Sequence, residues 1–206
     1  MRIHSFLPSS SVNGPGDRVV IWFQGCELAC PGCFNSPTHS FTAGESFSPM
    51  NLARQIAETG KPGVTFSGGE PLHQVAALAD LMMLLKLKNP DISLGMYTGY
   101  SLKEASSGQF YHPQSIDNLK RGSWSHAMNK GWWNRVRGFL DFAVMGRFNQ
   151  RQLSSLPLRA SKNQTLELFS NRYTENDFTS QQVEFNISSE MIAITGFPTE
   201  KIYANA

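Results

Sequence analysis

Three cysteines constrain this chain more than any other feature, because all of them lie within eight consecutive residues, Cys26-Glu-Leu-Ala-Cys30-Pro-Gly-Cys33. Their spacing would place the thiolates on one face of a helix, but Pro31 and Gly32 break a helix at this point. The segment is therefore expected to be a loop that wraps its thiolates around a metal centre. Such a loop suits iron–sulfur or zinc, whereas a disulfide scaffold has scattered, even-numbered cysteines.

The number of cysteines leaves two kinds of metal site open. A cubane 4Fe-4S cluster has four irons, so three cysteines leave one iron without a protein ligand and free to bind a small molecule. A structural zinc site needs four protein ligands, and the fourth would have to be a histidine such as His39, in a C-x3-C-x2-C-x5-H arrangement. With no fourth cysteine in the sequence, an all-cysteine auxiliary cluster is excluded.

Short apolar runs rich in β-branched and aromatic residues alternate with helical patterns along the chain. The runs predict strands at residues 18–24, 63–66, 92–97 and 139–145. Helices are expected between them, one that begins at Pro49 with Ser48 as its N-cap and ends before Gly60, and one from Val75 to about Lys88. Strands that alternate with helices build a parallel sheet with crossover connections, so the expected fold class is α/β.

Two segments depart from this alternation. Residues 106–138 form an insert in which five basic residues stand against one acidic residue, together with Trp124, Trp132 and Trp133. These tryptophans either cover the core or form an interface patch, and the basic residues could also dock an acidic flavodoxin or ferredoxin. In the C-terminal extension, residues 165–206, apolar runs at 183–187 and 191–195 flank Ser188-Ser189-Glu190 and predict an antiparallel β-hairpin.

Composition bounds the function classes. With 206 residues, 40% of them hydrophobic and 17% charged, the chain is expected to form a single domain over residues 1–206. A net charge of +2 is too mild to imply a nucleic-acid or anionic-membrane partner. No apolar run reaches the roughly 20 residues that span a bilayer, and the N-terminal residues lack the apolar region of a secretory signal. We therefore expect a cytoplasmic protein without a membrane partner.

The cysteine loop after the first strand and Ser67-Gly68-Gly69-Glu70-Pro71 at the end of the second resemble the radical SAM (S-adenosylmethionine) superfamily. Further motifs resemble the activating proteins of anaerobic ribonucleotide reductase, and the pyruvate formate-lyase activating enzymes share fewer of them. These motifs lie at residues 13–18, 24–26, 30–35, 44–47, 69–73, 98–100, 146–148 and 158–164. The resemblance covers about residues 1–100 and 139–165.

The resemblance implies a full or partial TIM-like barrel; we expect a partial one, with the β-hairpin at its C-terminal end. It also implies that Cys26, Cys30 and Cys33 hold a 4Fe-4S cluster whose fourth iron binds SAM. For SAM itself it implies Gly68, Gly69 and Glu70 near the ammonium group and Gly32 and Phe34 along the adenine. Thr98 is expected either to donate to SAM or to cap the helix before Leu102, and Arg147 either to meet the SAM carboxylate or to be a solvated surface residue. We assign His73 a structural role.

The function that the resemblance implies is that of a glycyl-radical-enzyme activating protein. Such a protein cleaves SAM reductively to a 5′-deoxyadenosyl radical, which takes a hydrogen atom from a backbone glycine of a partner, here expected to be anaerobic ribonucleoside-triphosphate reductase. Two alternatives remain: a stand-alone radical SAM enzyme that modifies a peptide or small molecule, and a Cys3His zinc interaction module. Family members tend to have Asp at the positions of Met145 and Glu70 and Gly at that of Ala160. These differences leave the identity of the partner enzyme undetermined.

Overall fold

The computed structural model describes residues 1–111, 126–178, 183–187 and 192–196. Its main sheet has seven strands in the order β3-β1-β2-β4-β5-β6-β7. The central strands β2, β4, β5 and β6 run parallel to one another, whereas β1, β3 and β7 pair antiparallel with their neighbours. The strand bounds are β1 (Arg2–Ser10), β2 (Arg18–Phe23), β3 (Glu45–Ser46), β4 (Gly63–Gly68), β5 (Ser93–Thr98), β6 (Phe142–Met145) and β7 (Thr165–Leu168).

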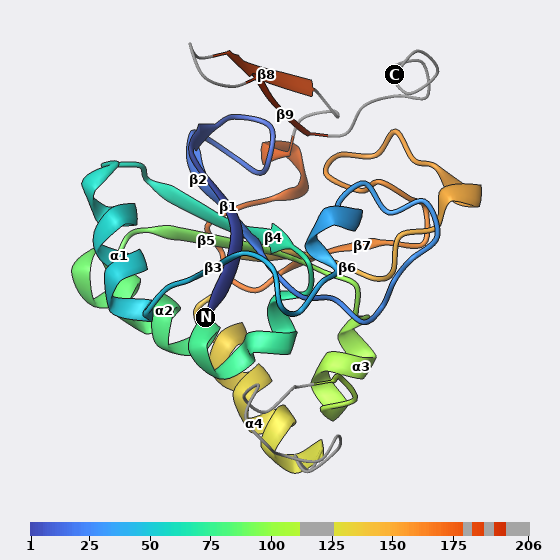
Figure 1. The fold of residues 1–206 in the computed structure, drawn as a ribbon, viewed down its shortest axis with the longest axis horizontal. Coiled ribbons are helices and arrows are strands. Elements are labelled where there is room, and N and C mark those ends of the chain that lie inside the picture. Colours follow the sequence, from blue (N-terminus) through green and yellow to red (C-terminus); the bar gives the residue numbers. More distant parts are fainter. Residues whose placement is uncertain (112–125, 179–182, 188–191, 197–206) are drawn as a thin grey trace.

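Helices line one side of this sheet (Figure 1). They are α1 (Pro49–Glu58), α2 (Val75–Lys88), α3 (Leu102–Ser107) and α4 (His126–Arg137). Helix α1 begins where the Ser48 side chain accepts the N–H of Asn51 at 3.1 Å, with Pro49 in the first turn, as the sequence predicts. Along the chain β2, α1, β4, α2 and β5 alternate, which confirms the expected mixed α/β class with a parallel centre.

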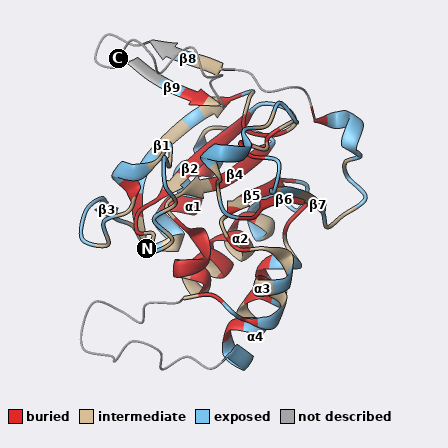
Figure 2. Ribbon diagram, turned by 90° about the vertical axis from the view of Figure 1, so that its right-hand side faces the viewer, coloured by how far each residue is buried: buried red, intermediate tan, exposed pale blue. Residues whose placement is uncertain are grey.

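The core lies between the sheet and the helices, as the buried ribbon segments in Figure 2 show. Helix α2 is covered on most sides, because Leu78, Leu81 and Met82 are all inaccessible to solvent. Trp133 of α4 is also fully buried and its ring meets that of Phe169 edge-on at 6.0 Å. Of the two interpretations of the insert tryptophans, covering the core is therefore correct for Trp133, while Trp124 lies outside the described residues.

A buried arginine holds the turn at residues 13–17 onto the sheet. Arg18 has no solvent exposure, and its Nε donates to Thr65 Oγ1 at 2.7 Å. Its Nη1 donates to the carbonyl of Pro15 at 2.6 Å, and its Nη2 to that of Val64 at 3.1 Å. The guanidinium also lies over the ring of Phe142, 5.0 Å from its centre. Buried cations need such partners, and here they fix the turn that follows β1.

A separate two-stranded antiparallel sheet, β8 (Val183–Ile187) and β9 (Ile192–Gly196), lies at the C-terminal side of the described chain. Its register pairs Phe185 with Ile194 and Glu184 with Thr195. Except for Gly196, these described strands fall in the segments 183–187 and 191–195 for which the sequence predicts an antiparallel β-hairpin. The expected turn at residues 188–190 and the expected strand start at residue 191 lie outside the described residues.

Candidate functional site

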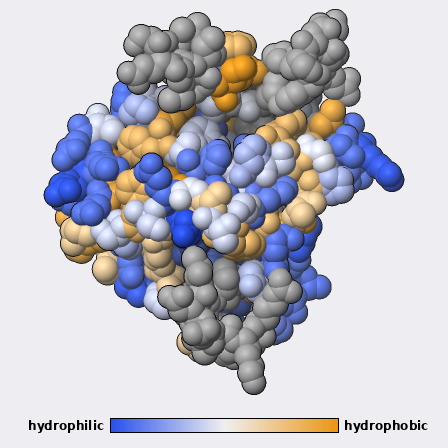
Figure 3. All heavy atoms as spheres, viewed as in Figure 1, coloured by the Kyte–Doolittle hydropathy of each residue, from blue (hydrophilic) through white to orange (hydrophobic). Residues whose placement is uncertain are grey.

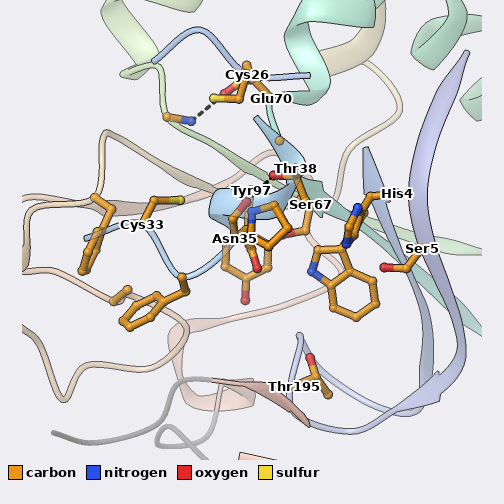
Figure 4. Close-up of a pocket in the computed structure, with 18 of the residues that line it drawn as sticks. His4, Ser5, Cys26, Cys33, Asn35, Thr38, Ser67, Glu70, Tyr97 and Thr195 are labelled. Carbon is orange, nitrogen blue, oxygen red and sulfur yellow. Dashed lines mark hydrogen bonds between the residues drawn. The ribbon is translucent and has the colours of Figure 1, made fainter. Parts of the chain in front are cut away.

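A cavity of about 880 Å³ opens at the carboxyl ends of the parallel strands (Figure 4). Its lining includes residues of the loop after β2, of the turn after β4, of the end of β5 and of the segment after β6. Ligands of parallel α/β sheets bind at this end of the strands. All expected site residues line the cavity except Gly32 and Arg147.

The cysteine loop is closed at its base by backbone hydrogen bonds. Gly25 N donates to Thr38 O at 2.7 Å and Cys26 N donates to His39 O at 3.1 Å. The side-chain amide of Gln24 adds a third tie, because its Nε2 donates to the carbonyl of Ser40 at 2.7 Å. The loop between these ties is therefore held as a unit at the end of β2.

Burial favours the protonated thiol over the thiolate at Cys26 and Cys33. Burial is the larger cause and the nearby Glu70 carboxylate the smaller cause that together raise the pKa of Cys26 to about 12. Hydrogen bonds from the backbone N–H groups of Leu28 and Ala29 lower this pKa. Burial likewise raises the pKa of Cys33, against a backbone N–H of Asn35. Backbone N–H groups that face cysteine sulfur are a recurrent feature of iron–sulfur sites, where they tune the cluster.

The described residues contain no group of three His, Cys, Asp or Glu side chains that converges on one metal ion. In a cubane 4Fe-4S cluster each cysteine binds a different iron, so the three sulfurs need not meet at one atom. Figure 4 shows Cys26 and Cys33 at separate points around the cavity.

Two glycines allow the turn after β4 to touch the cysteine loop. Gly68 has φ +98°, and a Cβ at this residue would lie 2.6 Å from Trp22 Cα and 2.7 Å from Phe23 O. A Cβ at Gly69 would lie 2.5 Å from Gly25 O. The close approach permits two backbone hydrogen bonds, from Gly69 N to Phe23 O at 2.8 Å and from Glu70 N to Gly25 O at 3.0 Å. Only glycine fits both positions without displacement of the backbone.

Glu70 joins the turn after β4 to the end of β5. Its fully buried carboxylate accepts from Leu72 N at 2.9 Å, from Thr98 Oγ1 at 2.8 Å and from Gly99 N at 2.8 Å. Burial raises the pKa of Glu70 to about 7, although these donors lower it. The hydroxyl proton of Thr98 is thus engaged by Glu70. The capping role considered for Thr98 is wrong, because Ser101 caps α3.

The remaining expected residues have different surroundings. The ring of Phe34 is partly exposed and packs against that of Phe148 at 4.8 Å between centroids. Gly32 has φ +70° and packs against the side chain of Gln150. Arg147 donates from Nη1 to Glu104 Oε1 at 2.8 Å and lies over the ring of Tyr100. His73 is buried and its Nε2 hydrogen-bonds to the Tyr100 hydroxyl at 3.0 Å, in agreement with a structural role.

Sequence reasoning did not find the side of the cavity that lies away from the cysteines. There His4, Trp22 and Tyr97 line it, together with Thr195 of β9. Strand β2 is apolar on both faces, so nothing in its sequence shows that Trp22 faces a cavity. The contact with β9 joins residues far apart in the chain and leaves no local signal.

Comparison with known proteins places the chain in a family. The model of the 4Fe-4S single cluster domain matches residues 12–167. The anaerobic ribonucleoside-triphosphate reductase-activating protein of Vibrio cholerae is 28% identical over 82% of this chain and 99% of its own length. That of Salmonella typhimurium is 32% identical over 59% of this chain and 84% of its own. Among solved structures, QueE from Escherichia coli is 20% identical with a TM-score of 0.37, over 48% of this chain and 52% of that one.

The cysteine loop and the glycine-rich turn at one end of a parallel sheet, together with these matches, define a radical SAM enzyme of the activating kind. The chain belongs to the 4Fe-4S single cluster domain family and, within it, to the anaerobic ribonucleoside-triphosphate reductase-activating proteins. The zinc interaction module is therefore wrong. No helix in the described part of the chain is long and apolar enough to cross a membrane.

Proposed function

We propose that this chain installs a glycyl radical on anaerobic ribonucleoside-triphosphate reductase, the enzyme after which its relatives are named. One observation carries the proposal. Two backbone hydrogen bonds hold the Gly68–Glu70 turn at one corner of the cavity, from Gly69 N to Phe23 O at the end of β2 and from Glu70 N to Gly25 O at the base of the cysteine loop. This contact supports the proposal, because it holds the proposed cluster loop beside the proposed SAM-binding turn.

Cys26, Cys30 and Cys33 are the proposed ligands of a 4Fe-4S cluster with one iron open to SAM. The backbone N–H groups of Leu28, Ala29 and Asn35 that face Cys26 and Cys33 support this assignment. When bound, the cluster supplies the electron for reductive cleavage of SAM to a radical that abstracts hydrogen. The role of the protein is to orient the reacting groups and to exclude water.

The SAM ammonium is proposed to lie at the Gly68–Glu70 turn. Glu70 Oε2 accepts one hydrogen bond from the described protein, which leaves it capacity for a second. Thr98 acts as a positioning residue, because it donates to Glu70 Oε1 at 2.8 Å. Phe34 lies beside Cys33 on the cavity wall and is proposed to contact the adenine. Arg147 is proposed to reach the SAM carboxylate by exchange with Glu104.

The wider assignments follow from the same family. We propose that the mixed sheet is a partial TIM-like barrel and that residues 1–206 form one domain. Residues 106–138 are an insert in this domain, and β8 and β9 form a C-terminal hairpin. The protein is proposed to be cytoplasmic. The electron donor is proposed to be an acidic flavodoxin or ferredoxin. Lys130, Arg135 and Arg137 are exposed on α4 and provide a basic face for steering such a partner. We propose no nucleic-acid or membrane partner.

The first experiment is anaerobic reconstitution with iron and sulfide, followed by reduction and addition of SAM. Production of 5′-deoxyadenosine, and of a glycine-radical signal in electron paramagnetic resonance when the reductase is added, is the expected result. 5′-Deoxyadenosine without a radical on the reductase would instead favour a stand-alone enzyme that modifies a peptide or small molecule.

Single alanine variants test the ligand assignment. Alanine at Cys26, Cys30 or Cys33 should abolish the cluster absorbance, whereas His39→Ala, the matched control, should retain it. Retained cluster absorbance in any one of the three cysteine variants would refute the assignment.

A further inference from the structure

A network of aromatic side chains lies beside the proposed site and outside the cavity. This aromatic network consists of Phe41, His73, Tyr100, Phe110 and Tyr111, none of which lines the cavity. Figure 3 shows mostly hydrophilic atoms over α3, the helix between Tyr100 and Phe110 in the chain, where Figure 1 places it. Tyr100, His73 and Phe110 are themselves buried. The network is therefore an inner layer of the molecule next to the ends of the strands.

The aromatic network contacts the cysteine loop through Phe41. A Cβ at Gly25, the residue before Cys26, would lie 2.7 Å from Phe41 Cδ1, so the ring packs directly on the base of the loop. The Phe41 ring also stacks on that of His73, with 5.8 Å between centroids and an interplanar angle of 25°. His73 follows the turn that ends at Glu70, and its backbone N–H donates to the carbonyl of Glu70 at 3.0 Å. A shift of His73 would therefore reach both the cysteine loop and the Glu70 turn.

The hydroxyl group of Tyr100 is the polar centre of the aromatic network. It hydrogen-bonds to Nε2 of His73 at 3.0 Å and accepts from the backbone N–H of Tyr111 at 3.1 Å. Burial raises the pKa of Tyr100, so the hydroxyl keeps its proton and has both donor and acceptor capacity for these two partners. Removal of this one oxygen would break both hydrogen bonds and leave the ring in place.

Tyr100 also adjoins the residues that are proposed to bind SAM. The backbone N–H of Gly146 donates to the carbonyl of Tyr100 at 3.1 Å and to that of Thr98 at 3.0 Å, which fixes the point where the Arg147 side chain starts. The guanidinium of Arg147 lies over the Tyr100 ring, 5.3 Å from its centre. The backbone N–H of Tyr100 donates to Thr98 Oγ1 at 3.2 Å, and this hydroxyl donates to Glu70. The placement of Arg147 and of Glu70 thus depends on Tyr100.

The described part of the insert packs on Tyr100 from the side of α4. The rings of Phe110 and Tyr100 are 5.9 Å apart. Asn129 of α4 is buried, and its Nδ2 donates to the carbonyls of Gly108 and Phe110 at 3.1 and 2.7 Å. The segment that follows α3 is thus fixed by α4 on one side and by Tyr100 on the other.

We propose that the insert supports the SAM site, and that it acts through the hydrogen bond between Tyr100 and His73. Both are positioning residues, because neither lines the cavity but together they fix where Arg147 and Glu70 stand before SAM binds. The inference rests on the proposed function and gives the insert a role at that same site. Side chains that are already held in place lose less freedom when a ligand binds, so their supports contribute to affinity.

The test measures the Kd of SAM for the anaerobically reconstituted holoprotein by equilibrium dialysis with radiolabelled SAM. Tyr100→Phe removes the hydroxyl and keeps the ring beneath Arg147, and it should raise the Kd about threefold to tenfold, as expected for the loss of about one hydrogen bond. Tyr111→Phe is the matched control and should leave the Kd unchanged, since only the backbone N–H of Tyr111 bonds to Tyr100. Iron content is measured alongside; a Kd that rises only where iron is lost would assign a purely structural role and overturn the proposal.

Variants of His73 separate its hydrogen bond from its ring. His73→Phe keeps a ring against Phe41 but loses the hydrogen bond to Tyr100, so it should also raise the Kd of SAM. The double variant with Tyr100→Phe should match Tyr100→Phe alone, because both changes remove the same hydrogen bond. His73→Gln, whose amide nitrogen can take the place of Nε2, should bind SAM more tightly than His73→Phe. Effects that multiply in the double variant, or a His73→Gln chain no better than His73→Phe, would overturn the pair.

Asn129→Ala tests the insert itself. It releases the segment after α3 from α4 and should raise the Kd of SAM, whereas Asn134→Ala, at an exposed position of the same helix, should not. An unchanged Kd in Asn129→Ala would overturn the role of the insert. If the original holoprotein binds no SAM, the proposed function itself is wrong. If it binds SAM and Tyr100→Phe binds equally well, this inference alone is refuted.

Discussion

Replacement of Gly68 by alanine should separate the cysteine loop from the turn after β4. The φ of +98° at this residue is unfavourable for alanine, which costs about 1–2 kcal/mol. The new Cβ would lie 2.6 Å from Trp22 Cα and 2.7 Å from Phe23 O, so β4 must move away from β2. That movement stretches the two hydrogen bonds from Gly69 N and Glu70 N, each of which contributes about 0.5–1.5 kcal/mol. The expected loss in unfolding free energy is about 2–5 kcal/mol.

Gly60→Ala is the matched control for this effect. Gly60 also has a positive φ, +64°, but a Cβ there meets nothing within 4 Å. Its expected cost is therefore the conformational strain alone, about 1–2 kcal/mol. The assay is urea unfolding of the apo chain in parallel with iron content after anaerobic reconstitution. Gly68→Ala should lose most of its iron and Gly60→Ala should retain it; equal stability and equal iron content in the two variants would refute the reasoning.

Three further predictions concern single side chains. Glu70→Gln replaces one carboxylate oxygen by an NH2 group, which then faces a group that already donates to this carboxylate. The unfolding free energy should therefore fall by about 1–3 kcal/mol; unchanged urea midpoints at pH 8 would contradict this. Trp133→Ala should cost about 3–5 kcal/mol because the ring is fully buried, and Trp132→Ala much less, as thermal unfolding can show. Burial raises the pKa of Glu104, but hydrogen bonds from Ser101 and Arg147 outweigh it and lower the pKa. The ionised Glu104 carboxylate therefore stabilises the fold above its ordinary pKa of 4.5, and this stabilisation disappears as the pH falls through the lowered pKa. Below pH 4.5 the unfolding free energy should fall more steeply for the original chain than for Glu104→Gln.

The parallel centre of the sheet could be predicted because its strands are short and apolar on both faces, a pattern that few other structures produce. Strand β1 was not predicted, because it contains Pro8 and five polar residues and pairs with β2 through two irregularities. Strand β7 has four residues, none of them fully buried. Strands at or next to the edge of the sheet, such as β7 and β1, are specified by their neighbours in the sheet, and their own sequence carries little periodic signal.

Helix α4 has helical spacing of its buried residues, but the abundance of Gly, Ser and Asn in the insert led us not to predict a helix there. Asn129, Trp133 and Val136 are its buried residues and follow helical spacing. Asn129 breaks the apolar pattern, yet its Nδ2 donates to the carbonyls of Gly108 and Phe110 at 3.1 and 2.7 Å. A buried amide of this kind ties the helix to the segment after α3. Because its partners lie about twenty residues earlier in the chain, the sequence alone gives it no reason to be buried.

The candidate site shows the same division between local and distant information. The cysteine spacing and the two glycines are local patterns, and in the structure the three cysteines, Gly68 and Gly69 line one cavity. The three donors to Glu70 come from residues 72, 98 and 99, so its function in joining β4 to β5 depends on tertiary structure. Sequence reasoning identified the residue and its neighbourhood, but it assigned Glu70 to the ligand and overlooked its bonds to the protein.

Arg147 can exchange its ion pair with Glu104 for a hydrogen bond to a ligand carboxylate only if the ion pair is the weaker of the two contacts. Its guanidinium is paired with Glu104 at 2.8 Å, and the two side chains are 46% and 27% exposed. An ion pair with this exposure is worth about 0–1 kcal/mol, whereas a hydrogen bond to the carboxylate of a bound ligand contributes about 1.5–3 kcal/mol. Glu104 keeps its hydrogen bonds from Ser101 when Arg147 leaves, so no buried charge is left unpaired. The ion pair can therefore hold Arg147 close to the cavity at little cost to the proposed exchange with SAM.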